Sequence, residues 1–164
     1  MANVFENIKC QKHCVAESSL LKATEVGHIY SLKMHEDMDN GSIVCVGDWV
    51  EAQVFASKDY EEGARPVFVL TPPIGYNSDR REYKDEQYFY NAKDEIARAY
   101  ELHVGDIFTV SDVIFDGEPA VGKFIDGNYA VADAAGEGFV GEIVEKVAYS
   151  QSTSYRVYVR SLGV

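Results

Sequence analysis

The residues best suited to chemistry lie in the stretch DNGSIVCVGDWVE at positions 39–51. It contains three carboxylates, Asp39, Asp48 and Glu51, together with Trp49, the single tryptophan of the chain. Two carboxylates roughly 5–10 Å apart can serve as the acid and base of a glycoside hydrolase, and an indole ring can stack on a sugar. The sequence does not fix that separation, so this chemistry depends on the elements that place the carboxylates.

The string Cys10-Gln-Lys-His13-Cys14 has the residue types of a metal site. A structural zinc site requires a second pair of ligands at similar spacing. The other candidates stand apart in the sequence: His28, His35, Cys45 and His103. We therefore predict no metal ligand and no cofactor. We expect free thiols, with Cys45 buried among its apolar neighbours.

Two Gly-Asp pairs, Gly47-Asp48 and Gly105-Asp106, each precede a bulky apolar residue. Glycine permits a turn or bulge, and aspartate can hydrogen-bond the backbone beyond it. Asp48 is therefore predicted to be a turn residue between strands at 42–47 and 49–56, with Asn40-Gly41 as a tight turn before them. No nucleophile motif or glycine-rich phosphate loop occurs in the sequence, and we predict no catalytic residue.

Four aromatic side chains lie within eight residues near the end of a polar, irregular segment at 75–91: Tyr83, Tyr88, Phe89 and Tyr90. Tyrosine is favoured at protein interfaces because it combines a large rigid surface with a polar tip. These four residues are our predicted partner-binding set. The alternative is that their rings pack the segment back onto the sheet.

The elements that must position these residues are mostly strands. Short apolar runs separated by Gly, Asp and Asn predict a mainly β fold, an antiparallel β-barrel or sandwich. At the C-terminus, Tyr155, Val157 and Val159 alternate with more polar residues, as in a strand with one buried face. One short helix is predicted over 91–103, and a long irregular loop over 75–91. We expect an N-terminal arm at 1–20 and a single β-rich domain at 21–164.

The chain has 164 residues and a formal net charge of −12, from 27 acidic and 15 basic side chains. This acidity argues against nucleic acid and against an anionic membrane surface as partners. No apolar run reaches the length of about 18 residues that a membrane span needs. The first ten residues lack the layout of a signal peptide, so we expect a protein made in the cytoplasm.

Four stretches carry a resemblance to a known family: DNGSIV…GDWVE at 39–51, ELHVGDIFTVS at 101–111, EPAVGKF at 118–124 and STSYRVYVRSLGV at 152–164. They resemble the head decoration or capsid-associated structural proteins of tailed phages, which are encoded near the major capsid protein. The resemblance implies a mainly β virion protein without enzymatic activity, located on the capsid exterior. Residues 1–20 and 75–91 carry little of it.

We therefore expect a non-enzymatic virion structural protein, made in the host cytoplasm, that binds the phage capsid surface and decorates or stabilises the head. Its expected partner is the major capsid protein, and a homo-oligomer is compatible with presentation on a symmetric lattice. The alternative is a small β-barrel carbohydrate-binding module or acid/base hydrolase. A cleft with converging carboxylates favours this alternative, whereas a flat apolar surface favours docking.

Overall fold

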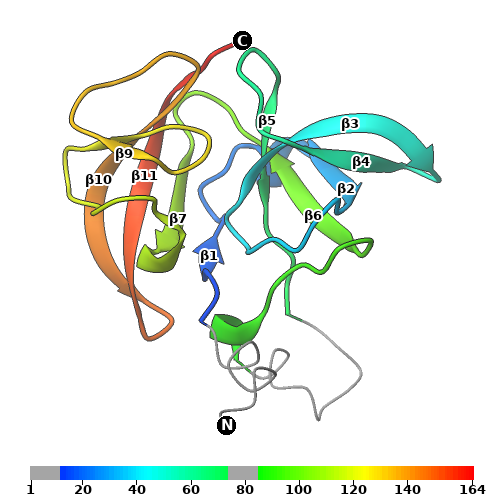
Figure 1. Ribbon diagram of the computed structural model, residues 1–164, viewed down its shortest axis with the longest axis horizontal. Coiled ribbons are helices and arrows are strands. Elements are labelled where there is room, and N and C mark those ends of the chain that lie inside the picture. Colours follow the sequence, from blue (N-terminus) through cyan, green and yellow to red (C-terminus); the bar gives the residue numbers. More distant parts are fainter. Residues whose placement is uncertain (1–11, 74–84) are drawn as a thin grey trace, which may run out of the picture.

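The chain forms two β-sheets that pack against each other (Figure 1). The computed structural model describes residues 12–73 and 85–164. The mainly β prediction is confirmed. The elements in chain order are β1 (Ala16–Glu17), α2 (Ala23–Val26), β2 (Ile29–Lys33), β3 (Ile43–Glu51), β4 (Val54–Asp59), β5 (Pro66–Val69), η2 (Glu86–Tyr88), β6 (Ile96–Glu101), β7 (Ile107–Ser111), η3 (Asp112–Ile114), β8 (Phe124–Ile125), β9 (Val131–Ala132), β10 (Phe139–Tyr149) and β11 (Ser152–Leu162).

The first sheet is a closed barrel with the strand order β2-β4-β3-β5-β6. β2 closes the barrel by pairing in parallel with β4 and antiparallel with β6. So few strands leave a narrow interior, which explains why alanines face it from β6. The buried core residues are Leu32, Met34, Val44, Val67, Val69, Ala97 and Ala99.

The second sheet has the order β1-β7-β11-β10-β8-β9, and its pairs are antiparallel. β10 and β11 form its long central hairpin. Ser150 and Gln151 connect them with φ of 46° and 63°, the positive angles that match the twist of a two-residue hairpin. The predicted alternation of β11 is confirmed, because Tyr155, Val157 and Val159 are all buried.

A shared hydrophobic core joins the two sheets. The ring of Phe68 on β5 lies 4.7 Å from that of Phe108 on β7. Cys14 is buried in the same core, and β1 pairs with β7 directly after it. Residues 1–20 were predicted as an N-terminal arm, but Ala16 and Glu17 within it pair in the sheet, because the edge of β7 supplies backbone partners for β1.

The helix predicted over 91–103 is wrong, since this segment contains β6. Helix-forming alanines and a glutamate suggested the helix, but Ala97, Ala99 and Glu101 face one side and Ile96 and Arg98 are exposed on the other. The backbone of β6 pairs with β2 and β5 at once, and this pairing outweighs local helix propensity. Among the described residues, the short α-helix is α2. Across residues 12–73 and 85–164, no helix has the length and apolar character needed to cross a membrane.

The predicted break at Gly47-Asp48 is also wrong, because β3 runs continuously through it. The pairing of β3 with β4 changes register between Val46 and Trp49, so these residues form a bulge within the strand. The hairpin turn lies at Ala52 and Gln53, with φ of 32° and 70°. Asn40-Gly41 does form a turn, with φ of 92° at Gly41.

Candidate functional site

The predicted partner-binding residues occupy unlike environments. Tyr83 lies outside the described residues. Tyr88 is half-buried within η2, and Phe89 is only 8% exposed. Tyr90 is 37% exposed. Phe89 therefore holds this segment onto the fold, whereas Tyr90 presents an aromatic surface to solvent.

The start of the described chain lies beside this aromatic segment, as the blue and green ribbons of Figure 1 show. The backbone N–H of His13 donates to the carbonyl of Gln87 at 2.7 Å. The His13 ring lies 5.0 Å from that of Tyr90. We call residues 12–13, 39 and 86–90 the junction surface. Part of the predicted N-terminal arm and the predicted partner-binding segment, which are distant in sequence, thus form one surface.

Asp39 stabilises the junction surface through contacts with His13 and Cys14. Its carboxylate lies 2.6 Å from Nδ1 of His13 and accepts the backbone N–H of Cys14 at 2.9 Å. The nine residues of β3, which lie between Asp39 and the far end at Glu51, alone extend roughly 26 Å. The carboxylates of the 39–51 stretch therefore do not converge on one centre. Asp48 and Glu51 are exposed near the far end of β3.

Trp49 is 59% exposed beside that far end. Its ring meets the edge of Phe55 at 5.3 Å, and Phe55 meets Tyr30 at 6.0 Å. This aromatic row runs across three strands of the barrel. Trp49 is thus a surface residue, although an indole beside Val50 in a strand is more often part of a core.

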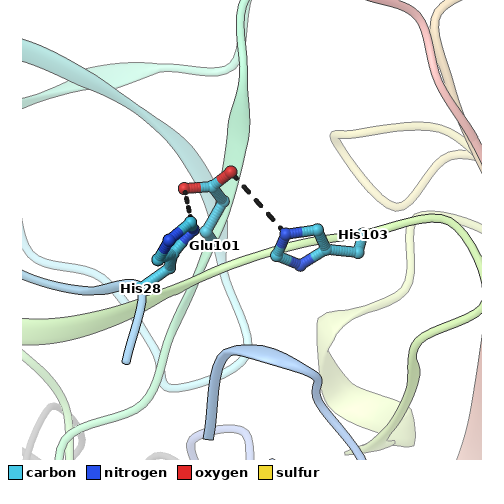
Figure 2. Close-up of side chains that lie close together, drawn as sticks. All are labelled: His28, Glu101 and His103. Atoms are coloured by element: carbon cyan, nitrogen blue, oxygen red, sulfur yellow. Dashed lines mark ion pairs between the residues drawn. The ribbon is translucent and has the colours of Figure 1, made fainter. Parts of the chain in front are cut away.

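A second cluster lies at the end of β6, where two histidines approach one glutamate (Figure 2). Nδ1 of His28 lies 3.3 Å from one oxygen of Glu101, and Nε2 of His103 lies 3.8 Å from the other. The pairing of β2 with β6 brings them together, because the N–H of Glu101 donates to the carbonyl of His28 at 3.0 Å. Glu101 is 8% exposed.

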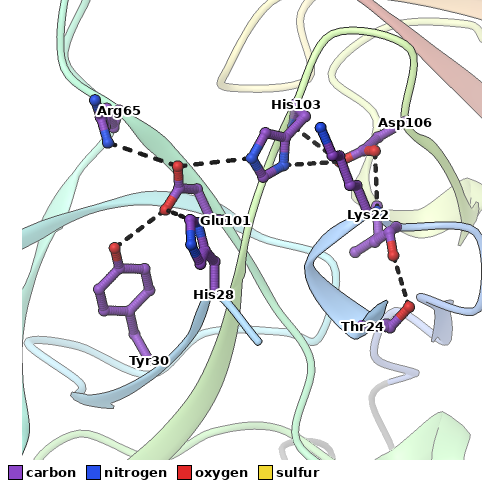
Figure 3. A network of polar contacts seen from close by, with 9 residues as sticks. Lys22, Thr24, His28, Tyr30, Arg65, Glu101, His103 and Asp106 are labelled. Atoms are coloured by element: carbon purple, nitrogen blue, oxygen red, sulfur yellow. Dashed lines mark hydrogen bonds and ion pairs between the residues drawn. The ribbon is translucent and has the colours of Figure 1, made fainter. Parts of the chain in front are cut away.

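Other polar groups surround this cluster (Figure 3). The hydroxyl of Tyr30 donates to Glu101 at 3.1 Å, and Arg65 lies 3.6 Å from the same carboxylate. Burial, followed by the charge of Glu101, raises the pKa of Tyr30, so its hydroxyl keeps its proton. Asp106 is buried beside Nδ1 of His103, 3.8 Å away.

Sequence reasoning missed this cluster because its members looked scattered. Glu101 and His103 are close in sequence, but His28 joins them only through the strand register of a barrel that the sequence does not reveal. With 91–103 predicted as a helix, no β2–β6 pairing could be inferred. The spacing Glu-x-His alone carries no signal specific to a metal.

The other candidate metal ligands take part in different interactions. Both ring nitrogens of His35 have partners, Ser57 at 2.6 Å and Asp59 at 2.8 Å. In the Cys10-His13-Cys14 string, Cys10 lies outside the described residues. Burial raises the pKa of the Cys14 thiol from 9.0 to about 12, which disfavours the thiolate that a metal requires. Cys45 is a buried thiol, as predicted.

A cleft of about 430 Å³ lies where the two sheets meet, next to the junction surface. Its lining includes two carboxylates, Glu17 and Glu86. Glu17 accepts hydrogen bonds from Ser19 and Thr109, and Glu86 accepts one from Ser150. These hydroxyl contacts orient both carboxylates toward the protein's own side chains.

Comparison with known proteins gives no relative: no protein-family model, curated protein or solved structure matches this chain.

Proposed function

We propose that this protein is a non-enzymatic structural component of a tailed-phage virion that binds the major capsid protein through the junction surface. It would be made in the host cytoplasm and decorate or stabilise the outside of the head. The observation that supports the proposal best is the joining of residues 12–13 to the aromatic segment 86–90. The resemblance of four sequence stretches to head decoration proteins supplies the class of partner.

The junction surface has the construction that a docking site needs. Phe89 is buried and Asp39 ties down His13, so the backbone beneath Tyr90 is held in place before any partner arrives. A preorganised surface loses less conformational entropy on binding. Tyr90 then offers an amphipathic ring of the kind that dominates interface energetics. Many copies on one lattice multiply a modest affinity.

Co-sedimentation with empty capsids tests the proposal. Tyr90→Ala should weaken binding by about 1–2 kcal/mol, roughly five- to thirtyfold, because it removes an aromatic contact from the interface. Tyr158→Ala is the matched control, since Tyr158 is a partly exposed tyrosine on β11, stacked with Arg160. If wild type and Tyr90→Ala bind capsids equally well, the junction surface is not the docking site. Absence of the protein from purified virions by mass spectrometry would refute the function itself.

A second candidate is a carbohydrate-binding module, favoured by the exposure of Trp49 at the end of the aromatic row. The chain has a single tryptophan, so its fluorescence reports on this position alone. Titration with a panel of oligosaccharides would shift the emission of Trp49 if a sugar stacks there. If the Trp49 emission does not change with any oligosaccharide and capsid binding is intact, the carbohydrate-binding candidate is excluded and capsid docking is retained.

A further inference from the structure

We propose that His28, Glu101 and His103 bind a divalent transition-metal ion such as Zn²⁺. One ligand atom from each residue can be chosen so that all lie within 4.8 Å of one another. The three residues come from the start of β2, the end of β6 and the connection to β7, so the backbone of both strands positions them. This inference goes beyond the proposed capsid function and does not depend on it.

The ligand types suit zinc. Two imidazoles and one carboxylate form a recognised set of three protein ligands, with a fourth position left for water or another group. Tetrahedral ligands about 2.0–2.1 Å from zinc lie about 3.4 Å from one another. Nδ1 of His28 lies 3.3 Å from one oxygen of Glu101 and Nε2 of His103 lies 3.8 Å from the other, so the carboxylate must turn to present one oxygen to both nitrogens at that spacing. The two rings lie 6.1 Å apart, centroid to centroid, so small side-chain rotations suffice.

Asp106 lies where the supporting carboxylate of a metal-binding histidine is usually found, 3.8 Å from Nδ1 of His103 and so without a hydrogen bond to it. A ligating histidine typically directs its other ring N–H to a carboxylate, which fixes the tautomer. Asp106 lies on the Nδ1 side of His103 and is itself held by the backbone N–H groups of Lys22, at 3.1 Å, and His103, at 2.8 Å. Nδ1 of His103 is buried and has no hydrogen-bond partner in the described part of the chain. Nε2 therefore faces Glu101 and is available to a metal.

The charges around the cluster also favour a cation. The cluster includes two buried carboxylates, Glu101 and Asp106, and the guanidinium of Arg65 lies 3.6 Å from Glu101. The Arg65 side chain is 76% exposed, so it can move into solvent when an ion takes the glutamate oxygen. Arg65 is then a competitor of the metal. An ion-pair network without metal would instead depend on Arg65 to balance Glu101.

Calorimetric titration of the metal-stripped full chain with Zn²⁺ tests the site. We expect one equivalent to bind, and Co²⁺ in its place to give the visible absorption of a tetrahedral complex. We expect Zn²⁺ binding to weaken by about 100-fold or more in each of three variants: His28→Ala, His103→Ala and Glu101→Gln. This is the upper end of the loss in metal affinity that follows removal of a residue supporting a ligand. His28 has a side chain 55% exposed, so His28→Ala tests the site with little risk to folding.

Two further variants distinguish this metal site from the His35 group and from an ion-pair network without metal. His35→Ala is the matched control, because His35 belongs to the other group of three candidate ligands and should leave affinity unchanged. Arg65→Gln should tighten Zn²⁺ binding by roughly two- to fivefold, the effect of removing one exposed charge. The proposal is overturned if no saturable binding occurs, if His28→Ala and His103→Ala bind as wild type does, or if Arg65→Gln weakens binding.

Discussion

Asp48 and Asp106 both follow a glycine, but their environments differ. Asp48 is exposed at the bulge of β3. Asp106 is 4% exposed, and its two oxygens accept the backbone N–H groups of Lys22 and His103. The shared Gly-Asp pattern predicted one local role for both residues. The role of Asp106 depends also on Lys22 at the start of α2, which a local pattern does not reveal.

Replacing each aspartate by asparagine should expose this difference. Asp106→Asn turns one accepting oxygen into a donor that faces a backbone N–H, so we expect a loss of about 1–3 kcal/mol in the free energy of unfolding. Asp48→Asn should change it by less than about 0.5 kcal/mol, as is usual at exposed positions. Urea denaturation of both variants measures the contrast. A larger cost for Asp48→Asn would contradict the bulge assignment.

Cys14 should make the fold sensitive to alkali. Burial raises the pKa of its thiol from 9.0 to about 12 in the folded protein. The unfolded chain therefore loses the proton first as pH rises, and stability present below about pH 9 is lost progressively up to about pH 12. At about pH 10 the loss is about 1.4 kcal/mol. Urea denaturation at several pH values should show this slope in the wild type and a shallower one in Cys14→Ala, whose side chain does not titrate.

At the scale of elements, the sequence predicted strands better than it predicted their boundaries and partners. β11 was predictable because its large apolar residues alternate clearly with polar ones. β6 was not, because the barrel interior accepts only alanines there, and alanine also favours helix. The Glu101 cluster was unpredictable for the same reason, since its geometry follows from the pairing of β6 with β2. Asn40-Gly41 was predictable as a turn, but not as a contact between sheets.

Gly41 lies where the barrel touches the second sheet, and its replacement should loosen that contact. A Cβ at Gly41 would lie 2.8 Å from Val110 and 3.2 Å from Cys14, at a φ of 92°. We expect Gly41→Ala to cost about 2–4 kcal/mol through backbone strain and overpacking. Gly63→Ala is the matched control, because Gly63 has a φ of 83° but nothing within 4 Å of a Cβ. Thermal unfolding of both variants separates the cost of backbone strain from that of packing. Equal losses of stability in the two variants would argue against a packing role for Gly41.

The acidity of the whole molecule should appear in its association kinetics. On the proposed capsid partner, a net charge of −12 would steer the protein toward basic regions, and salt screens that attraction over about 10 Å at 0.1 M. Raised salt should therefore slow association with empty capsids more than it speeds dissociation. Tyr90→Ala should instead speed dissociation from the capsid more than it slows association. Surface-based binding kinetics at low and high salt measure both rates, and a salt effect confined to dissociation would contradict steering.

The position of β1 at the edge of β7 has a consequence for synthesis on the ribosome. Strands β2 to β6 emerge in succession, so the barrel can close before strands β7 to β11 have emerged. β1 emerges before all of them, but its partner β7 comes after the barrel, and β7 pairs in turn with β11, the final strand. Because nascent domains fold as their partners appear, we expect the thiol of Cys14 to stay accessible to reagents and oxidants on the translating ribosome. It should become inert only when the second sheet is complete, after β11 has emerged.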